Sequence, residues 1–257
     1  MIQLFKHLED GSALDFYIFQ VLLFGLDMSP TRVVVMIWIA GLLTYWLVSR
    51  AAAGDPYHPR GFHNFFEVIL IYFRDQVVLP NMGKEGLVHL PLMVTGFFFI
   101  LFMNLLGLLP PPFGQTPTGN ILVTATLAAF AFVMIQLVGI RKYGFWRHWR
   151  NLVPPVPIFL VPLMVVVEGL GVIMKPFALC VRLFANMTAG HCLILGFLTL
   201  IFLAGNLPAW GAWPIAIVTD LVIVAIFCLE LLVAFIQAFV FVFLTAVFMG
   251  QSMHAHH

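Results

Sequence analysis

Charged residues are scarce in this 257-residue sequence: Asp, Glu, Lys and Arg make up 9% of it, whereas 62% of its residues are hydrophobic. Soluble domains carry about 25% charged residues, so too few charges are present to cover a surface that faces water. The net charge of +1 gives no sign of a nucleic-acid partner, and we expect none. With a mean hydropathy of +1.05, the composition predicts a polytopic integral membrane protein.

Cysteine is sparse, and the N-terminus lacks a processing signal. Cys180, Cys192 and Cys228 lie in apolar runs without CxxC spacing, which is typical of small core residues rather than of disulfides or metal ligands. Lys6 is followed by acidic residues, and no small-residue cleavage site closes the apolar run 16–26. We therefore expect a bacterial or organelle-encoded membrane protein.

Catalytic and nucleotide-binding motifs are missing as well. The sequence contains no GxxxxGK[ST], HExxH or GxSxG pattern. We expect no catalytic site in this chain, no cofactor and no metal site. The closing HAHH segment is either a metal-binding tract or a mobile tail.

Long uncharged runs predict an all-α membrane domain that crosses the bilayer five times. The expected spans are 31–50, 87–109, 120–140, 154–204 and 213–250, within a single membrane domain 1–257. Asn120 is the expected N-cap of the third span. As one helix, the 154–204 run would be roughly 75 Å long, against a hydrocarbon core of about 30 Å. Each of the last two runs is therefore either a hairpin or one long, strongly tilted helix.

The segment 62–79 has a different pattern. Its apolar residues recur at helical spacing and lie opposite polar ones, which predicts an amphipathic helix. Such a helix lies in the membrane interface or packs on other protein. The apolar stripe consists of Phe62, Phe65, Phe66, Ile69, Phe73 and Val77.

Basic residues gather in one loop and predict the orientation. The 141–150 loop holds four Lys or Arg residues and no acid, whereas the first 30 residues hold four acids and one Lys. Cytoplasmic loops carry an excess of Lys and Arg. We therefore expect the 141–153 loop and the C-terminus in the cytoplasm and the N-terminus outside.

Ionisable residues interrupt the last two apolar runs. A charged side chain at bilayer depth costs about 2.5–3.5 kcal/mol, so such residues mark a functional site by default. Glu168, Lys175 and Arg182 recur every seven residues and share a helix face, as do Glu230 and Gln237. One alternative is a self-neutralising network that pairs Glu168 with Lys175 and Arg182 with Glu230. We favour an ion path instead. The ionisable residues that would form it are Glu168, Lys175, Arg182, His191, Asp220 and Glu230.

Arg182 fits such a path because a guanidinium does not lose its charge in proteins. A mobile carboxylate gains from approaching Arg182 only when it is ionised. A fixed arginine between two aqueous half-channels would force a carrier to release its proton before it passes, and would repel a proton that crosses directly. Arg182 would then act as a valve rather than as a binding site.

Four stretches resemble subunit a of F-type ATP synthases: LCVRLFANMTAGH, LELLVAFIQAFVFVFLTAVF, FFFILFMNLLGLLP and PTGNILVTATLA. The resemblance runs from about residue 30 to 250. It implies a stator subunit that lies in the lipid bilayer against a ring of c subunits, with peripheral stalk b subunits and other synthase subunits as partners. It also implies long, tilted last helices and ATP chemistry on other subunits. The expected location is the bacterial inner membrane, with the mitochondrial inner membrane as the alternative.

The resemblance also assigns roles residue by residue. Arg182 matches the essential arginine of the family, and Gln237 matches its glutamine partner on the last helix. Asn104 and Asn186 match polar positions of the inlet channel. Glu168 and Lys175 match polar positions on the arginine helix, with Glu168 towards the outlet. His191 and Glu230 match positions that carry the reverse pair in some members, and they form either a proton relay or a structural hydrogen bond.

Two other functions remain open from the residues alone. A secondary transporter could use the same buried charges, but it would usually show internal repeats, and none is found. An intramembrane hydrolase is the enzymatic alternative, although the sequence lacks its motifs. Whether the transported ion is H⁺ or Na⁺ depends on the c subunit.

Overall fold

Helices make up nearly all of the structure, a computed structural model that describes residues 22–23, 26–27, 32–52, 61–109, 117–151, 159, 161–205 and 209–253. The two-residue strands β1 and β2 form a short antiparallel pair. Glu9, Asp10, Asp15 and the closing histidines lie outside the described residues. The elements in chain order are β1 Leu22–Leu23, β2 Leu26–Asp27, α2 Arg32–Ala52, α3 Phe62–Tyr72, a π-helix Phe73–Val78, α4 Leu79–Met82, a 3-10 helix Lys84–His89, α5 Leu90–Gly107, a 3-10 helix Pro117–Gly119, α6 Ile121–Tyr143, α7 Phe145–Asn151, α8 Val161–Ala204 and α9 Ala209–Met253.

Five of these helices are long and apolar enough to cross a membrane, and the all-α, polytopic membrane fold is confirmed. The membrane-crossing segments are Val33–Ala52, Lys84–Gly107, Ile121–Tyr143, Leu163–Ala204 and Trp213–Met253. Large apolar side chains such as Trp38, Leu42 and Leu221 lie exposed on them. An apolar outer surface of this kind suits lipid rather than water.

Local sequence sets the ends of α6. The side chain of Asn120 accepts a hydrogen bond from the backbone N–H of Leu122 at 2.9 Å, so the predicted N-cap is confirmed. At the other end Gly144 adopts φ 79°, a conformation that glycine tolerates without strain. The chain turns there and enters α7 directly.

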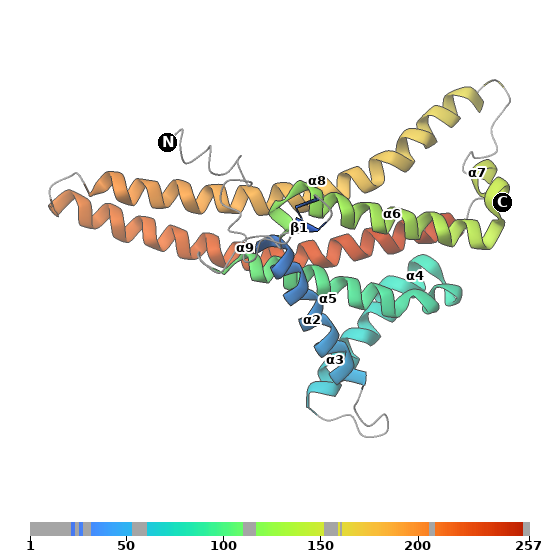
Figure 1. Ribbon diagram of the computed structural model, residues 1–257, viewed down its shortest axis with the longest axis horizontal. Coiled ribbons are helices and arrows are strands. Elements are labelled where there is room, and N and C mark those ends of the chain that lie inside the picture. The colour runs from blue at the N-terminus through green and yellow to red at the C-terminus, as the bar shows by residue number, and fades with distance from the viewer. Residues whose placement is uncertain are drawn as a thin grey trace.

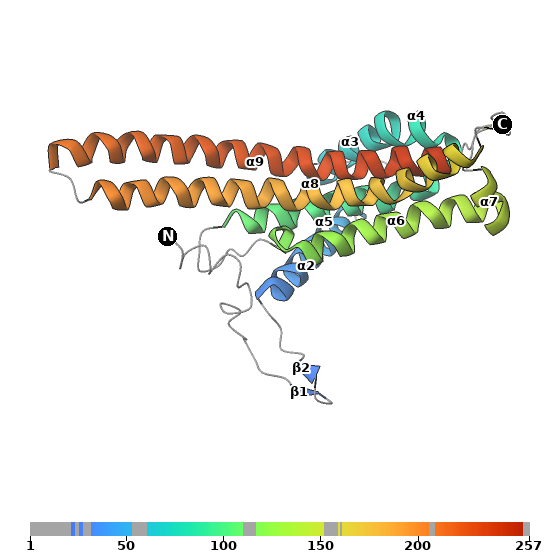
Figure 2. The same cartoon turned by 90° about the horizontal axis from the view of Figure 1, so that it is seen from above.

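The run predicted at 154–204 forms one helix and not a hairpin: α8 is continuous over 44 residues, and Pro176 lies inside it. The preceding residues 154–158 lie outside the described part of the chain. α9 is similarly long, at 45 residues, and packs against α8. Both views show the outer parts of α8 and α9 side by side, with α2 steeply inclined to them, whereas the N-terminal part of α8 diverges from α9 in Figure 1 (Figure 1, Figure 2). The outer ends of the pair extend beyond the other helices.

The core lies where α5 packs against α2 and α9, and where α6 packs against α8 and α9. Phenylalanine rings fill much of it, and Phe97 contacts both Phe73 and Phe98. Small residues on α9, including Ala238 and Ala246, are fully buried and let the neighbouring helices approach closely. This core holds the inner half of α9 in a fixed position.

The amphipathic segment at 62–79 is continuous from α3 through the π-helix into α4. Phe66, Phe73 and Val77 of its apolar stripe are buried, and the second half of the segment packs on α5 and α9. Phe65, in contrast, is exposed. The second half of the segment therefore packs on other helices of the chain, and a position of the first half in the membrane interface stays a prediction.

Candidate functional site

Helices α5, α8 and α9 bring four of the predicted polar residues together. Asn186 of α8 donates a hydrogen bond from Nδ2 to Oε1 of Gln237 on α9, at 2.8 Å. Asn104 of α5 is buried and donates from Nδ2 to the carbonyl oxygen of Ala234, at 3.2 Å. These bonds join residues that are 51 and 130 positions apart, so they tie the three helices to one another.

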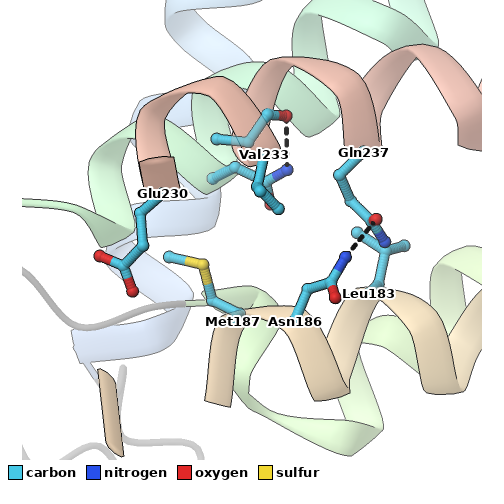
Figure 3. A pocket seen from close by; sticks show the side chains of 8 residues that line it. Leu183, Asn186, Met187, Glu230, Val233 and Gln237 are labelled. Atoms are coloured by element: carbon cyan, nitrogen blue, oxygen red, sulfur yellow. Dashed lines mark hydrogen bonds between the residues drawn. The ribbon is translucent and has the colours of Figure 1, made fainter. Parts of the chain in front are cut away.

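A small cavity lies between these residues (Figure 3). The space open to water within it is about 20 Å³, enough for one water molecule. Glu230 and Gln237 project into it from α9, towards the α8 side chains. The lining residues are Asn104, Leu183, Asn186, Met187, Glu230, Val233, Ala234 and Gln237.

Glu230 is the acidic member of this group. It is 8% exposed, and neither carboxylate oxygen has a hydrogen-bond partner among the residues that the structure describes. The carboxylate lies against the backbone of Gly190 on α8, where an added Cβ would overlap Oε1. Gly190 therefore provides the space that the carboxylate occupies.

Two more buried polar atoms lie on the same stretch of α8. Within the described part of the chain, Thr188 Oγ1 and His191 Nε2 both lack a hydrogen-bond partner. No ion pair within 4.0 Å joins His191 to Glu230 among the described residues. Buried polar groups in proteins are nearly always hydrogen-bonded, to ordered water where protein groups are absent. Glu230 lines the water-sized cavity, whereas Thr188 and His191 are not among its lining residues.

Arg182 lies outside the buried stripe of α8. Leu179 and Leu183 are buried, and Cys180 contacts the hydroxyl of Thr124 on α6, at 3.5 Å. Arg182 itself is exposed on the surface of the chain. Within the described part of the chain it has no ion pair, so the alternative pairing of Arg182 with Glu230 does not form.

Lys175 has a different partner from the one that the alternative network assigns. Its Nζ donates to Oε1 of Gln251 at 2.9 Å and lies 5.0 Å from the ring centroid of Phe248, both near the end of α9. Glu168 lies two helical turns before Lys175 on α8. It is half-buried and forms no ion pair with Lys175. The self-neutralising network is thus absent among the described residues.

Asp220 is exposed on the outer half of α9 and does not line the cavity. Sequence reasoning missed Thr188, Gly190 and Gln251. Thr188 and Gly190 stand within the quoted stretch MTAGH, so their proximity to His191 was visible. The sequence did not show which residues of α9 face them.

Comparison with known proteins gives a consistent family match. The family model described as ATP synthase A chain matches residues 34–250. A protein named ATP synthase subunit a from Anaeromyxobacter dehalogenans (strain 2CP-C) is 45% identical over 237 residues, which cover 90% of this chain and 60% of that protein. One from Myxococcus xanthus (strain DK1622) is 44% identical, covering 90% of this chain and 75% of that protein. The chain spans about 60% of the length of the Anaeromyxobacter relatives.

Proposed function

The chain belongs to the ATP synthase A chain family, and from that premise we propose that it is the proton-conducting stator subunit of the membrane sector of an F-type ATP synthase. Its partners are then the ring of c subunits, the peripheral stalk b subunits and the other synthase subunits. The bacterial relatives favour a bacterial inner membrane, with the mitochondrial inner membrane as the alternative. ATP chemistry takes place on partner subunits.

The observation that carries the proposal is that Arg182 on α8 is exposed and forms no ion pair with any described residue. Arginine stays charged in proteins, and a cation exposed at bilayer depth costs about 2.5–3.5 kcal/mol. A partner that presents carboxylates to this face of α8 would offset that cost. The carboxylates of a c ring have the required charge.

The shape of the α8–α9 pair suits a ring. At 1.5 Å per residue, the 44 residues of α8 span about 66 Å. A helix of that length fits a hydrocarbon core of about 30 Å only if it tilts by roughly 60° from the membrane normal. The steep inclination of α2 to the pair in both views supports such a tilt (Figure 1, Figure 2). The pair then offers a long face to several c subunits at once.

Protons enter from the outside through the polar region near the cavity. Asn186, His191 and Glu230 lie along this route, with Asn104 and Gln237 lining its inner part and Asp220 on the outer half of α9. The buried, unpartnered atoms of His191 and Glu230 support it, because they are placed to bind water. A c-subunit carboxylate takes up the proton and carries it around the ring.

Protons leave on the cytoplasmic side near Glu168. This residue lies fourteen positions before Arg182 on α8, about 21 Å along the helix axis. Arg182 stands between the two routes, with Lys175 on the outlet side. The gradient supplies about 2.3 kcal/mol per charge per 100 mV, which the ring converts into rotation.

Substitution of Arg182 tests the proposal. We expect Arg182→Ala to abolish ATP synthesis and to let protons leak through the membrane sector, because nothing then forces the carrier to release its proton. Arg182→Lys should fail too, since a desolvated ammonium can lose its proton. Both effects are measured in sodium-free vesicles, by ATP synthesis driven by ΔpH and by passive proton flux.

Arg50→Ala is the matched control. Arg50 is likewise an exposed arginine, at the end of α2, where it lies 5.6 Å from the ring centroid of Trp46. The Arg50→Ala variant should leave ATP synthesis and the passive proton flux unchanged. Near-normal ATP synthesis by assembled Arg182→Ala complexes would overturn the valve role, and failure of the chain to co-purify with a c ring and stalk would overturn the stator assignment.

A further inference from the structure

The end of the bundle that carries α7 presents aromatic rings outwards. Trp146 is 85% exposed, and Phe145 and Trp149 are exposed beside it. All three belong to a helix that begins one residue after Gly144, where the crossing helix α6 has just ended. Trp and Tyr concentrate at membrane–water boundaries because their rings are apolar and carry a polar edge. This position fits that boundary.

A single buried side chain fixes the orientation of α7. His148 is 2% exposed, and its Nε2 lies 2.8 Å from Oε1 of Gln136 on α6. Its ring fills the space that a Cβ at Gly139 would need. Burial lowers the pKa of His148 and so favours its neutral ring. With His148 turned inwards, the tryptophans must face outwards.

Cations at this end outnumber acids. Lys84, Arg141, Lys142 and Arg147 are exposed here, whereas the acidic residue beside them is Glu85, which pairs with Lys142 at 2.6 Å. Neither Arg141 nor Arg147 has a carboxylate within 4.0 Å in the described part of the chain. Two guanidinium groups therefore remain for an external anion.

We propose that Arg141 and Arg147 bind the phosphate diester of an anionic phospholipid headgroup, while Phe145, Trp146 and Trp149 lie among the upper parts of its acyl chains. The lipid-facing side chains of α6, such as Val133 and Leu137, lead directly to this place. An acidic protein segment would satisfy the two arginines but offers no apolar contact to the three rings. A phospholipid satisfies both, because its phosphate lies just above its apolar chains.

The experiment uses the assembled complex in phosphatidylcholine nanodiscs. The discs carry a trace of either photoactivatable phosphatidylglycerol or photoactivatable phosphatidylcholine with the same acyl chains. After irradiation, mass spectrometry measures the labelling of residues 141–151. We expect more labelling by phosphatidylglycerol than by phosphatidylcholine. R141Q and R147Q should each lower the phosphatidylglycerol labelling by about fivefold, the effect expected for one cation near an anionic surface.

The double variant R141Q/R147Q should reduce phosphatidylglycerol labelling to the phosphatidylcholine level, whereas the control R50Q should not change it. W146L should lower labelling by both lipids, because it removes the apolar contact and not the charge. Equal labelling by the two lipids, or labelling that R141Q/R147Q does not lower, would overturn the proposal. Loss of labelling on addition of millimolar inorganic phosphate would also overturn it and would assign a site for free anions. Cross-linking of an acidic segment from another subunit in place of lipid would overturn it as well.

Discussion

Glu230 lies at the contact of α8 with α9, and its two carboxylate oxygens have no hydrogen-bond partner in the part of the chain that the structure describes. A buried carboxylate without partners is costly, so water must solvate it or a proton must neutralise it. His191 and Thr188 present unpartnered atoms on the facing stretch of α8. A water bridge between these groups would let a proton pass between His191 and Glu230 without direct contact.

Removing either end of this bridge should slow proton entry. We expect Glu230→Gln and His191→Ala to lower ATP-driven proton pumping by about tenfold or more, because each removes a group that can accept and release a proton. The membrane should stay tight, since Arg182 is intact. Pumping and passive leak are measured in the same vesicles, across pH 6 to 9. Exchanging the two residues should restore part of the flow.

Glycine substitutions give a matched control for this interpretation. Gly190→Ala places a Cβ where the Glu230 carboxylate lies and should slow pumping, whereas Gly196→Ala on the same helix meets open space and should not. If Glu230→Gln and His191→Ala assemble normally and pump at the wild-type rate, the relay is wrong and the residues serve structure alone.

At the scale of single residues, the sequence predicted which polar residues lie within apolar helices but not all of their partners. The seven-residue spacing placed Glu230 and Gln237 on one face of a helix, and both line the cavity. The spacing of Glu168 and Lys175 indicated an ion pair as one alternative, but Lys175 instead donates to Gln251, 76 positions away. Pairing across such distances depends on how α8 and α9 align, and helical periodicity does not determine it.

At the scale of elements, uncharged runs and caps located the helices well. Asn120 begins α6 as its side-chain chemistry predicts, and Gly144 ends it. Length alone did not decide whether the 154–204 run was one helix, because Pro176 within it could equally have marked a turn. The π-helix Phe73–Val78 was not predicted either, since its apolar spacing fits an ordinary helix.

Where α9 ends, several elements hold it. Tyr143 Oη donates to the carbonyl oxygen of Met253 at 2.6 Å, and Lys175 binds Gln251. Gly250 lies against the backbone of α4, where an added Cβ would overlap the carbonyl oxygen of Asn81. These contacts join α4, α6 and α8 to the last turns of α9.

Gly250→Ala should therefore destabilise the protein, although alanine favours a helix over glycine by about 1 kcal/mol. The overlap is with a backbone atom that cannot rotate away, and overpacking costs about 1–3 kcal/mol. We expect a lower thermal unfolding midpoint for the purified complex, with reduced incorporation of the chain. Gly96→Ala on α5 is the control, because its Cβ would meet Val242 at an ordinary 3.8 Å. Equal midpoints for the two variants would show that α4 is free to shift.

At the scale of the whole molecule, the α8–α9 pair extends past the helices that support it (Figure 1, Figure 2). Among the described residues, its outer half therefore has few neighbours besides the pair itself, and this half is available to lipid or to a partner subunit. The inner half is fixed by α5 and α6, which also position Asn104 and the turn to α7. A rigid inner half with an uncovered outer half is consistent with a stator that lies against another body.

The span count makes the orientation of this arrangement testable. Three helices that are long and apolar enough to cross a membrane, α2, α5 and α6, come between residue 15 and Arg147 in the sequence, so we expect the two residues on opposite sides of the membrane. From the excess of cations around Arg147 we expect this residue in the cytoplasm. In a chain whose exposed Cys192 and Cys228 are replaced by serine, Arg147→Cys should react with a membrane-impermeant thiol reagent only from the cytoplasmic side, and Asp15→Cys only from outside. Mass shifts after labelling intact and inverted vesicles measure this.

Reaction of both residues from one side would contradict the number of spans. If Arg147→Cys reacted only from outside and Asp15→Cys only from the cytoplasm, the fold would stand. The proton inlet and outlet would then exchange places, because Glu168 would face the outside.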